Sequence, residues 1–472
     1  MDKNKHLPFQ LISLAFLVVL VLPVLIQDGM FMDGQQYACV AKNLAEGKGS
    51  FWFPHLSDTW WKAGSPHFME HPPLVYGMQS MFFKVFGNSL YTERIYSFFT
   101  LLIALMLIIR IWKFCFSKKS PHHHAWWVAV LFWIWIPLTS WSYQNNLMEN
   151  SMLMFDLLAV FFLLKFLKGG KNYIMLALGS LAIFAAFLSK GLPGLFPLLI
   201  IPLHGIVFRD KSVGFYAIHS LLFLVLSSVW LLLIVQWQDA GESLGFYLKE
   251  RLLTRISDDP TVKSQYFIIK QLLINLIPVL FTMILLLIVQ KRLRISKLSR
   301  QQAKLSALFL LTGLSASLPL FLTPVQRGFY LMPSFPFFAI SAAILVLPVI
   351  HHYVHKSIVN KSKTILLIIG IVFIASAFIY SGSRIGKTGR HELVLEDAHA
   401  IGGIVPENTI ITAPEQLYDN WALQVYLVRH YNISMKVSNE ETKWTLSDYV
   451  EGVGNPIICL ESGPWVLYRT PE

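Results

Sequence analysis

The chain is poor in charge. Only 14% of its 472 residues are charged, whereas 55% are hydrophobic, and a soluble globular protein has roughly 25% charged residues. This scarcity argues against an ordinary soluble protein, and the mean hydropathy of +0.54 predicts a polytopic membrane protein. A chain of this length has room for about ten helical spans of roughly 20 residues and a small soluble domain.

Cysteine is also scarce, with three residues in the chain. We expect Cys39 and Cys459 to face the outer compartment and Cys115 the cytoplasm. The sequence permits a disulfide between Cys39 and Cys459, although separate thiols are favoured. The chain also lacks a convincing internal repeat, a low-complexity tract and any His/Asp/Glu spacing that would demonstrate a metal centre.

Apolar segments of membrane-spanning length dominate the rest of the sequence. The first follows Lys3 and Lys5, but its apolar run is long and no small-x-small cleavage site follows it, so we expect a retained helix. We predict an α-helical polytopic membrane protein with about 11 transmembrane helices, at 7–26, 92–111, 125–142, 150–167, 172–189, 192–208, 213–235, 267–289, 304–322, 329–349 and 363–381.

The distribution of Lys and Arg predicts the orientation of these spans. Alternating the spans places the basic clusters on the side of the N-terminus, which the positive-inside rule assigns to the cytoplasm. The formal charge of +12 is therefore attributed mainly to membrane anchoring, and nucleic-acid binding is disfavoured. The clusters are Arg110/Lys113/Lys118/Lys119, Lys165/Lys168/Lys171, Arg209/Lys211, Lys291/Arg292/Arg294/Lys297/Arg300/Lys304 and Lys356/Lys361/Lys363.

Three outer segments are too long to be simple turns, and long loops often carry function. They are 27–91, 236–266 and the tail from 384. We predict a transmembrane domain at 1–383, which includes both loops, and a small periplasmic α/β domain at 384–472. Within the tail, the segments 409–412, 424–427, 457–460 and 465–468 have the composition of short strands.

Three acidic residues lie near the outer ends of spans, where an ionisable group is costly and therefore a functional candidate. Asp33 precedes a short predicted helix, 35–44, and its alternative role is to cap that helix. Glu70 precedes two prolines, which hold the chain extended and present the carboxylate rigidly. Glu149 lies in a polar turn between two apolar spans, and a hydrated turn is the alternative for its neighbours Asn145 and Asn146.

Basic residues complete the set on the same face. Lys190 and Arg327 fall in tight outer turns, and Arg255 lies in the loop 236–266. Either turn residue could instead extend to the lipid head groups. Carboxylates and cations on one membrane face suit a reaction in which a phosphate leaves and a hydroxyl or amine attacks.

Several motifs, in this order along the chain, resemble membrane glycosyltransferases of the GT-C fold. The resemblance is closest to the bacterial aminoarabinose transferase that modifies lipid A and to the dolichyl-phosphate-mannose protein mannosyltransferase family, and it covers roughly residues 7–350. The motifs are Asp33-x-x-x-Tyr37-Ala38, Glu70-His71-Pro72-Pro73-Leu74, Phe86-Gly87, Thr92-Glu93-Arg94-Ile95-Tyr96-Ser97, the Glu149 turn, Lys190-Gly191 and the segment from Arg327 to Pro336.

The resemblance implies transfer of a sugar from a polyprenyl-phosphate donor to an acceptor. It makes Asp33 the catalytic base and gives Glu70 and Glu149 catalytic positions, with a divalent metal ion near Glu70 as a candidate cofactor. We expect the donor phosphate to be bound by residues among His71, Lys190, Arg255 and Arg327: either His71 is protonated beside Glu70, or another cation such as Arg327 or Arg255 replaces it. We expect Tyr37 and Tyr330 in the substrate cavity.

Two residues depart from the family pattern. His71 replaces the usual lysine of Glu-Lys-Pro-Pro, so a permanent cation becomes a group with an unperturbed pKa of about 6.5. Gly34 replaces the second acid of an Asp-Glu pair, which favours the aminoarabinose-transferase side of the resemblance.

The sequence thus predicts an inverting glycosyltransferase of the bacterial inner membrane, with a cytoplasmic N-terminus. Its expected partners are a polyprenyl-phosphate-linked sugar, a lipid or protein acceptor and membrane lipids, with no nucleic acid. We expect a monomer. A polytopic transporter or lipid flippase is the alternative, and a scaffold that presents the outer tail is a third hypothesis.

Overall fold

The computed structural model describes residues 3–61, 65–169, 172–253, 261–356, 360–437, 442–448 and 456–469. The chain divides into two compact units. The helical unit comprises 1–24, 98–144 and 148–383, and the α/β unit comprises 25–97, 145–147 and 384–472. The α/β unit therefore joins the tail to the long loop, 27–91, that follows the first helix.

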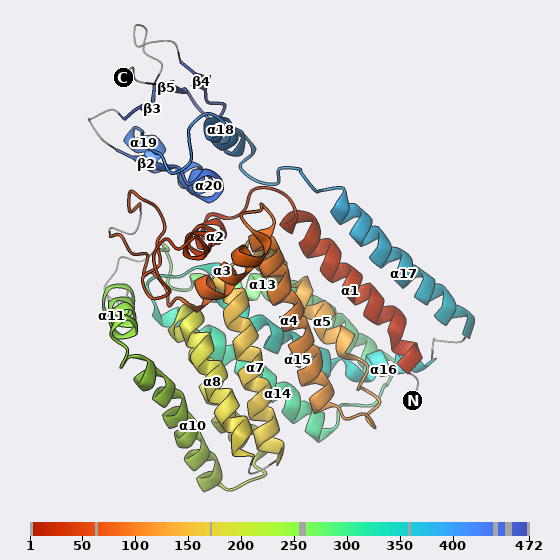
Figure 1. The fold of residues 1–472 in the computed structure, drawn as a ribbon. Helices are drawn as coiled ribbons and strands as arrows, with labels where there is room; N and C mark the ends of the chain where they lie inside the picture. Colours follow the sequence, from red (N-terminus) through yellow and green to blue (C-terminus); the bar gives the residue numbers. More distant parts are fainter. Residues whose placement is uncertain are drawn as a thin grey trace. The chain divides into compact units, whose positions relative to one another are not determined.

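Apolar helices make up the helical unit (Figure 1). Its helices, with α1 and α4 continuing into the α/β unit, are α1 (Lys3–Leu25), α4 (Thr92–Cys115), α5 (Trp126–Trp135), α6 (Pro137–Gln144), α7 (Met148–Gly169), α8 (Tyr173–Lys190), η1 (Leu192–Leu199), α9 (Ile200–Phe208), α10 (Val213–Ile234), α11 (Gln238–Phe246), η2 (Tyr247–Leu253), α13 (Phe267–Arg292), α14 (Arg300–Ser317), η3 (Leu318–Leu322), η4 (Gly328–Ser334), α15 (Phe335–Leu345), α16 (Leu347–Lys356) and α17 (Asn360–Gly382).

In the part of the chain that the structure describes, nine helices are long and apolar enough to cross a membrane. They are Lys5–Leu25, Thr92–Cys115, Met148–Gly169, Tyr173–Lys190, Val213–Ile234, Phe267–Arg292, Arg300–Leu322, Gly328–Leu345 and Ser362–Gly382. The other two predicted spans, 125–142 and 192–208, contain shorter apolar helices.

Proline explains both shorter segments. In 125–142 the helix stops at Ile136, which is extended because the following Pro137 disfavours the helical conformation in the residue before it. In 192–208 the prolines at 193 and 197 coincide with the 3-10 helix η1, which precedes the regular helix α9.

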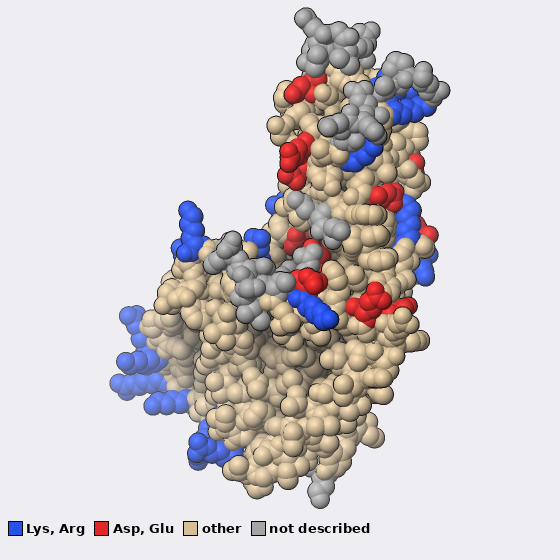
Figure 2. All heavy atoms as spheres, turned by 90° about the vertical axis from the view of Figure 1, so that its left-hand side faces the viewer, with Lys and Arg blue, Asp and Glu red and all other residues tan. Residues whose placement is uncertain are grey.

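Several helices expose apolar surface. The apolar windows of α10, α13 and α17 are only 11%, 22% and 17% buried inside the structure. Figure 2 shows that the visible surface of the helical unit is nearly free of charged side chains, apart from Lys and Arg along its margins. Such a surface suits lipid rather than water.

The α/β unit contains α2 (Met32–Ala45), α3 (Leu74–Phe86), α18 (Glu392–Gly402), α19 (Glu415–Tyr418) and α20 (Trp421–Tyr431). A five-stranded sheet has the order β2-β1-β3-β5-β4, with β1 (Ile410–Thr412), β2 (Ser434–Lys436), β3 (Trp444–Asp448), β4 (Ile458–Cys459) and β5 (Trp465–Arg469). Strand β1 pairs in parallel with β2 and β3, whereas β3–β5 and β4–β5 are antiparallel. Buried side chains of α18, α20 and the strands form its core.

The strand prediction for 424–427 is wrong, because this segment lies inside α20. The side chain of Asn420 caps the helix by accepting a hydrogen bond from the backbone N–H of Leu423. Most of the helix is buried, so its apolar residues have no clear helical periodicity and resemble a buried strand. The other three predicted strands coincide with β1, β4 and β5.

The cysteines are separate thiols. Cys39 is fully buried, whereas Cys459 is exposed. The Sγ atom of Cys39 donates a hydrogen bond to the carbonyl of Val425, and burial raises the pKa of the thiol to about 12.

Candidate functional site

The predicted site residues fall into both units. The α/β unit contains Asp33, Tyr37, Glu70 and His71, and the helical unit contains Glu149, Lys190, Arg327 and Tyr330. Arg255 lies outside the described residues.

In the helical unit, Glu149 and Lys190 form a buried ion pair. Glu149 is the second residue of α7 and Lys190 is the last residue of α8, and their exposed fractions are 0% and 5%. The Glu149 Oε1 and Lys190 Nζ atoms lie 2.6 Å apart. Lys190 therefore does not extend to the lipid head groups, contrary to the alternative drawn from the sequence.

The end of α8 gives Lys190 this position. Gly191 ends the helix with a φ of 88°, a conformation that L side chains rarely adopt. A Cβ atom at Gly191 would lie 1.8 Å from the hydroxyl of Tyr247, and this hydroxyl donates a hydrogen bond of 3.4 Å to the Lys190 carbonyl. Glycine is thus required by both backbone conformation and space.

Two aromatic rings flank the Lys190 ammonium group. Its Nζ atom lies 5.1 Å from the ring centroid of Tyr330 and 5.5 Å from that of Phe329. Both rings belong to η4, so the predicted cavity residue Tyr330 does lie beside the ion pair. The Phe329 ring also stacks on Trp141.

Arg327 occupies a different environment from Lys190. It precedes η4 in extended conformation, its side chain is exposed, and it has no ion-pair partner among the described residues. Its neighbour Gln326 is buried and fixes the loop: its amide accepts from the backbone N–H of Ile268 and donates to the carbonyl of Gln265. Sequence reasoning did not single out Gln326.

In the α/β unit, Asp33 is half-buried in the first turn of α2 and does not cap the helix. The N-cap residue is Phe31, without a side-chain capping bond. The Phe31 N–H instead donates to Oδ1 of Asn145 at 2.8 Å. A carboxylate in the first turn of a helix interacts favourably with the helix dipole, and Asp33 occupies that position in α2.

The turn formed by Asn145 and Asn146 holds the start of α2. The Asn146 Nδ2 atom donates to the Gly34 carbonyl at 3.1 Å, and both asparagines are buried rather than hydrated. A Cβ atom at Gly34 would lie 1.8 Å from the Asn145 carbonyl oxygen. Any side chain at position 34, an acid included, would therefore collide with the asparagine turn as it stands.

Tyr37 shares α2 with Asp33, and its ring contacts the Glu70-His71 segment. It lies one turn after Asp33 on α2, and its ring centroid is 6.1 Å from that of His71 and 6.1 Å from that of Tyr76. The buried Pro72 and Pro73 follow at the start of α3. The structure thus brings Tyr37 and His71 together.

The tail domain fixes the position of α2 within the α/β unit. Lys42 is 1% exposed, and its Nζ atom donates to the carbonyls of Val428 and Arg429 at the end of α20 and to Oδ1 of Asn432. Burial lowers the pKa of Lys42 to about 8. Arg429 in turn pairs with Glu93 at 2.6 Å.

Asp28 makes a second connection to the tail, just before α2. Its carboxylate accepts from the Gly29 N–H, and lies 3.2 Å from Nε2 of His399 and 3.6 Å from Arg94. Burial alone would raise the pKa of Asp28, but His399, His430 and Arg94 lower it to about 2. Spacing gave no signal for these contacts, because the residues are far apart in sequence.

The residues that the structure describes contain no group of three or more His, Cys, Asp and Glu side chains able to hold a metal ion. The divalent ion expected near Glu70 stays a prediction from the sequence, and no catalytic step is assigned to a metal.

Comparisons with known proteins identify the fold. A family model described as dolichyl-phosphate-mannose-protein mannosyltransferase matches residues 70–233. The structure of ArnT from Cupriavidus metallidurans bound to undecaprenyl phosphate is similar with a TM-score of 0.60 and 13% identity, covering 90% of this chain and 85% of ArnT. The chain has the fold of a GT-C membrane glycosyltransferase.

Two further structures share this GT-C fold. ArnT from the same organism in the apo state gives a TM-score of 0.57 at 13% identity, over 89% of this chain and 83% of ArnT. The apo oligosaccharyltransferase of Archaeoglobus fulgidus gives 0.50 at 11% identity, over 93% of this chain but only 62% of that protein. No curated protein matches the chain by sequence.

The region that matches the family model contains some of the predicted site residues and not others. Residues 70–233 include Glu70, His71, Glu149 and Lys190, whereas Asp33 precedes the region and Arg327 follows it. These comparisons lend no support to the transporter alternative.

Proposed function

We propose that this protein transfers a sugar from a polyprenyl-phosphate donor to a lipid or protein acceptor, with inversion at the anomeric carbon. The observation that carries the proposal is the buried Lys190, held by Glu149 beside Tyr330. A fixed cation in a site of low dielectric is suited to the charge that develops on a departing phosphate. The similar ArnT structure contains undecaprenyl phosphate.

The proposed reaction assigns a role to each group. The Asp33 carboxylate takes the proton of the acceptor hydroxyl or amine while the acceptor atom bonds to the anomeric carbon. The bond between that carbon and the phosphate oxygen breaks, and polyprenyl phosphate leaves with the electron pair. Lys190 stabilises the phosphate, and Glu149 holds Lys190 in position. The phosphate contacts expected for His71, Arg255 and Arg327 stay predictions from the sequence.

Glu70 and Tyr37 complete the proposal in the α/β unit. Tyr37 contacts the His71 ring, and the two prolines after His71 limit the movement of Glu70. We assign Glu70 to orientation of the acceptor or donor near Asp33. A divalent ion near Glu70 stays a prediction, and transfer after dialysis against EDTA tests it.

We place the protein in the bacterial inner membrane, with the N-terminus in the cytoplasm and residues 384–472 in the periplasm. The exposed apolar helices support a location in a membrane, and the basic clusters of the sequence support this orientation. Transfer on the periplasmic face follows from it.

Mass spectrometry of envelope lipids and glycoproteins tests the function. Cells that express the protein should carry molecules heavier by one sugar, and these should disappear on deletion of the gene or in the Asp33→Asn variant at equal membrane abundance. NMR of the product linkage gives the anomeric configuration. Identical lipid and glycoprotein profiles with and without the gene would contradict the proposal, and so would normal transfer by Asp33→Asn for the role of the base.

A further inference from the structure

A pocket of about 360 Å³ lies in the helical unit, far from the Glu149–Lys190 pair. Lys168, which lines the pocket, and Glu149 lie near opposite ends of α7 and are separated by roughly 28 Å at about 1.5 Å per residue. The basic clusters of the sequence place this end of the helices in the cytoplasm. The pocket is therefore separate from the residues of the proposed transfer reaction.

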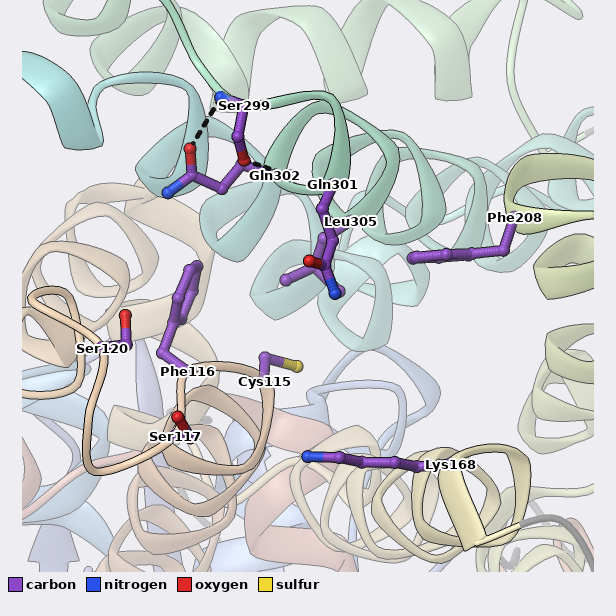
Figure 3. A pocket seen from close by; sticks show the side chains of 10 residues that line it. All are labelled: Cys115, Phe116, Ser117, Ser120, Lys168, Phe208, Ser299, Gln301, Gln302 and Leu305. Carbon is purple, nitrogen blue, oxygen red and sulfur yellow. Dashed lines mark hydrogen bonds between the residues drawn. The ribbon is translucent and has the colours of Figure 1, made fainter. Parts of the chain in front are cut away.

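The pocket combines one cation with neutral polar groups and an apolar wall. In Figure 3 the side chain of Lys168 extends toward the pocket from α7, Gln301 reaches it from α14, and Phe208 closes one side. The hydroxyls of Ser117 and Ser120 lie on the opposite side. No acidic residue is among the described residues that line it.

The structure preorganises one wall of the pocket. Ser299 and Gln302 form a capping box at the start of α14, with the hydroxyl accepting from one backbone N–H and the amide oxygen accepting from the other. The Nζ atom of Lys304 donates to the Phe208 carbonyl at 2.7 Å, which ties α14 to the end of α9. The Nζ atom of Lys168 lies 4.9 Å from the centroid of the Phe114 ring.

We propose that this pocket binds the phosphate head group of an anionic phospholipid. Lys168 supplies the charge, the serine hydroxyls and the Gln301 amide supply hydrogen-bond donors, and Phe208 and Leu305 suit the glycerol and the first methylenes. Anionic lipids are attracted to basic residues at the membrane surface. The site would couple the protein to lipid composition independently of the donor.

Cys115 lines the pocket and reports on its occupancy. In a Cys459→Ser background we would measure the rate at which N-ethylmaleimide alkylates Cys115, by mass spectrometry of the peptide. Phosphatidylglycerol added to the micelles should slow this rate about fivefold relative to phosphatidylcholine. Lys168→Gln should abolish the protection.

Lys165→Gln is the matched control, because Lys165 lies on the same helix but contacts Phe161 rather than the pocket. It should keep the protection. Equal rates in both lipids, or protection that survives Lys168→Gln, would overturn the proposal. Equal protection by inorganic phosphate would assign the pocket to a soluble anion and overturn the lipid assignment.

Native mass spectrometry gives a second measurement that does not depend on Cys115 reactivity. The original chain and Lys165→Gln should retain one phosphatidylglycerol molecule at a voltage at which Lys168→Gln has lost it. Equal retention by all three proteins would refute the site. Both experiments are independent of glycosyl transfer, so failure of the proposed function leaves this test intact.

Discussion

At the scale of single residues, Lys190 carries a charge into the interior of the helical unit. Its partner Glu149 is fully buried, and the aromatic rings of Phe329 and Tyr330 flank the ammonium group. Such a pair is costly to desolvate, and its net contribution to stability is often small, whereas removal of one partner leaves an uncompensated charge. Removing one partner should therefore destabilise the protein more than removing both. A comparison of single and double variants can thus separate an effect on stability from an effect on catalysis.

We predict that Glu149→Gln destabilises the protein by about 3–5 kcal/mol, because Lys190 is left buried without its carboxylate. The double variant Glu149→Gln/Lys190→Met should recover most of this loss, since no charge remains, but it should not recover sugar transfer. Thermal unfolding in detergent and a transfer assay measure the two effects. A double variant as unstable as Glu149→Gln would argue against the ion pair.

Gly34 permits the close approach between α2 and the asparagine turn. Gly34→Ala should displace the turn or the start of α2, because the new Cβ would lie 1.8 Å from the Asn145 carbonyl oxygen. We expect transfer to fall at least about tenfold, with membrane insertion retained. Gly214→Ala is the control, because that position is open within 4 Å. Equal activity of the two variants would show that the position of Asp33 tolerates this change.

At the scale of elements, α2 is held near both ends. Its start is bound by the Asn145-Asn146 turn, and Lys42 in its last turn binds the carbonyl end of α20. A cation at the C-terminal end of a helix is favoured by the helix dipole as well as by the hydrogen bonds. The tail domain therefore acts as a support for the helix that carries Asp33.

Acid should weaken a further contact between the tail and the segment before α2, the one between Asp28 and His399. The pKa of Asp28 is lowered from 3.8 to about 2, so its contribution of about 2 kcal/mol is present above pH 4 and is lost as the pH falls toward 2. We predict that the difference in melting temperature between the original chain and Asp28→Asn closes over this range. A difference that stays constant from pH 5 to 2.5 would contradict this account.

At the scale of the whole molecule, the proposed orientation gives each cysteine a distinct accessibility. In cells with a permeabilised outer membrane, an impermeant maleimide should label the exposed Cys459 directly. It should label Cys115 only after the inner membrane is disrupted, and the fully buried Cys39 under neither condition. Labelling of Cys459 only after disruption would place the tail in the cytoplasm.

Much of the fold follows from local sequence pattern. Hydropathy alone located the segments that contain the nine long apolar helices, because each span must bury its backbone polar groups in its own hydrogen bonds. Proline explains why 125–142 and 192–208 contain shorter helices. The segment 424–427 could not be assigned correctly, because a fully buried helix and a buried strand have the same apolar composition.

The candidate site was only partly predictable. The acids and lysines at span ends could be identified in the sequence, because an ionisable group beside an apolar span is energetically costly and is therefore a functional candidate. The pairing of Glu149 with Lys190, the contact of Tyr37 with His71 and the buried state of the asparagine turn were not visible. Each depends on which helix faces meet.

The sequence by itself determined that the protein lies in a membrane, where its spans are, and which residue types are available for chemistry. These properties depend on composition and short-range pattern. Only the tertiary structure decided that the tail domain belongs with the loop after the first helix, and that Lys42, Arg429 and Asp28 connect them. Those contacts join residues hundreds of positions apart. They are set by packing and buried hydrogen bonds, which leave no periodicity in the chain.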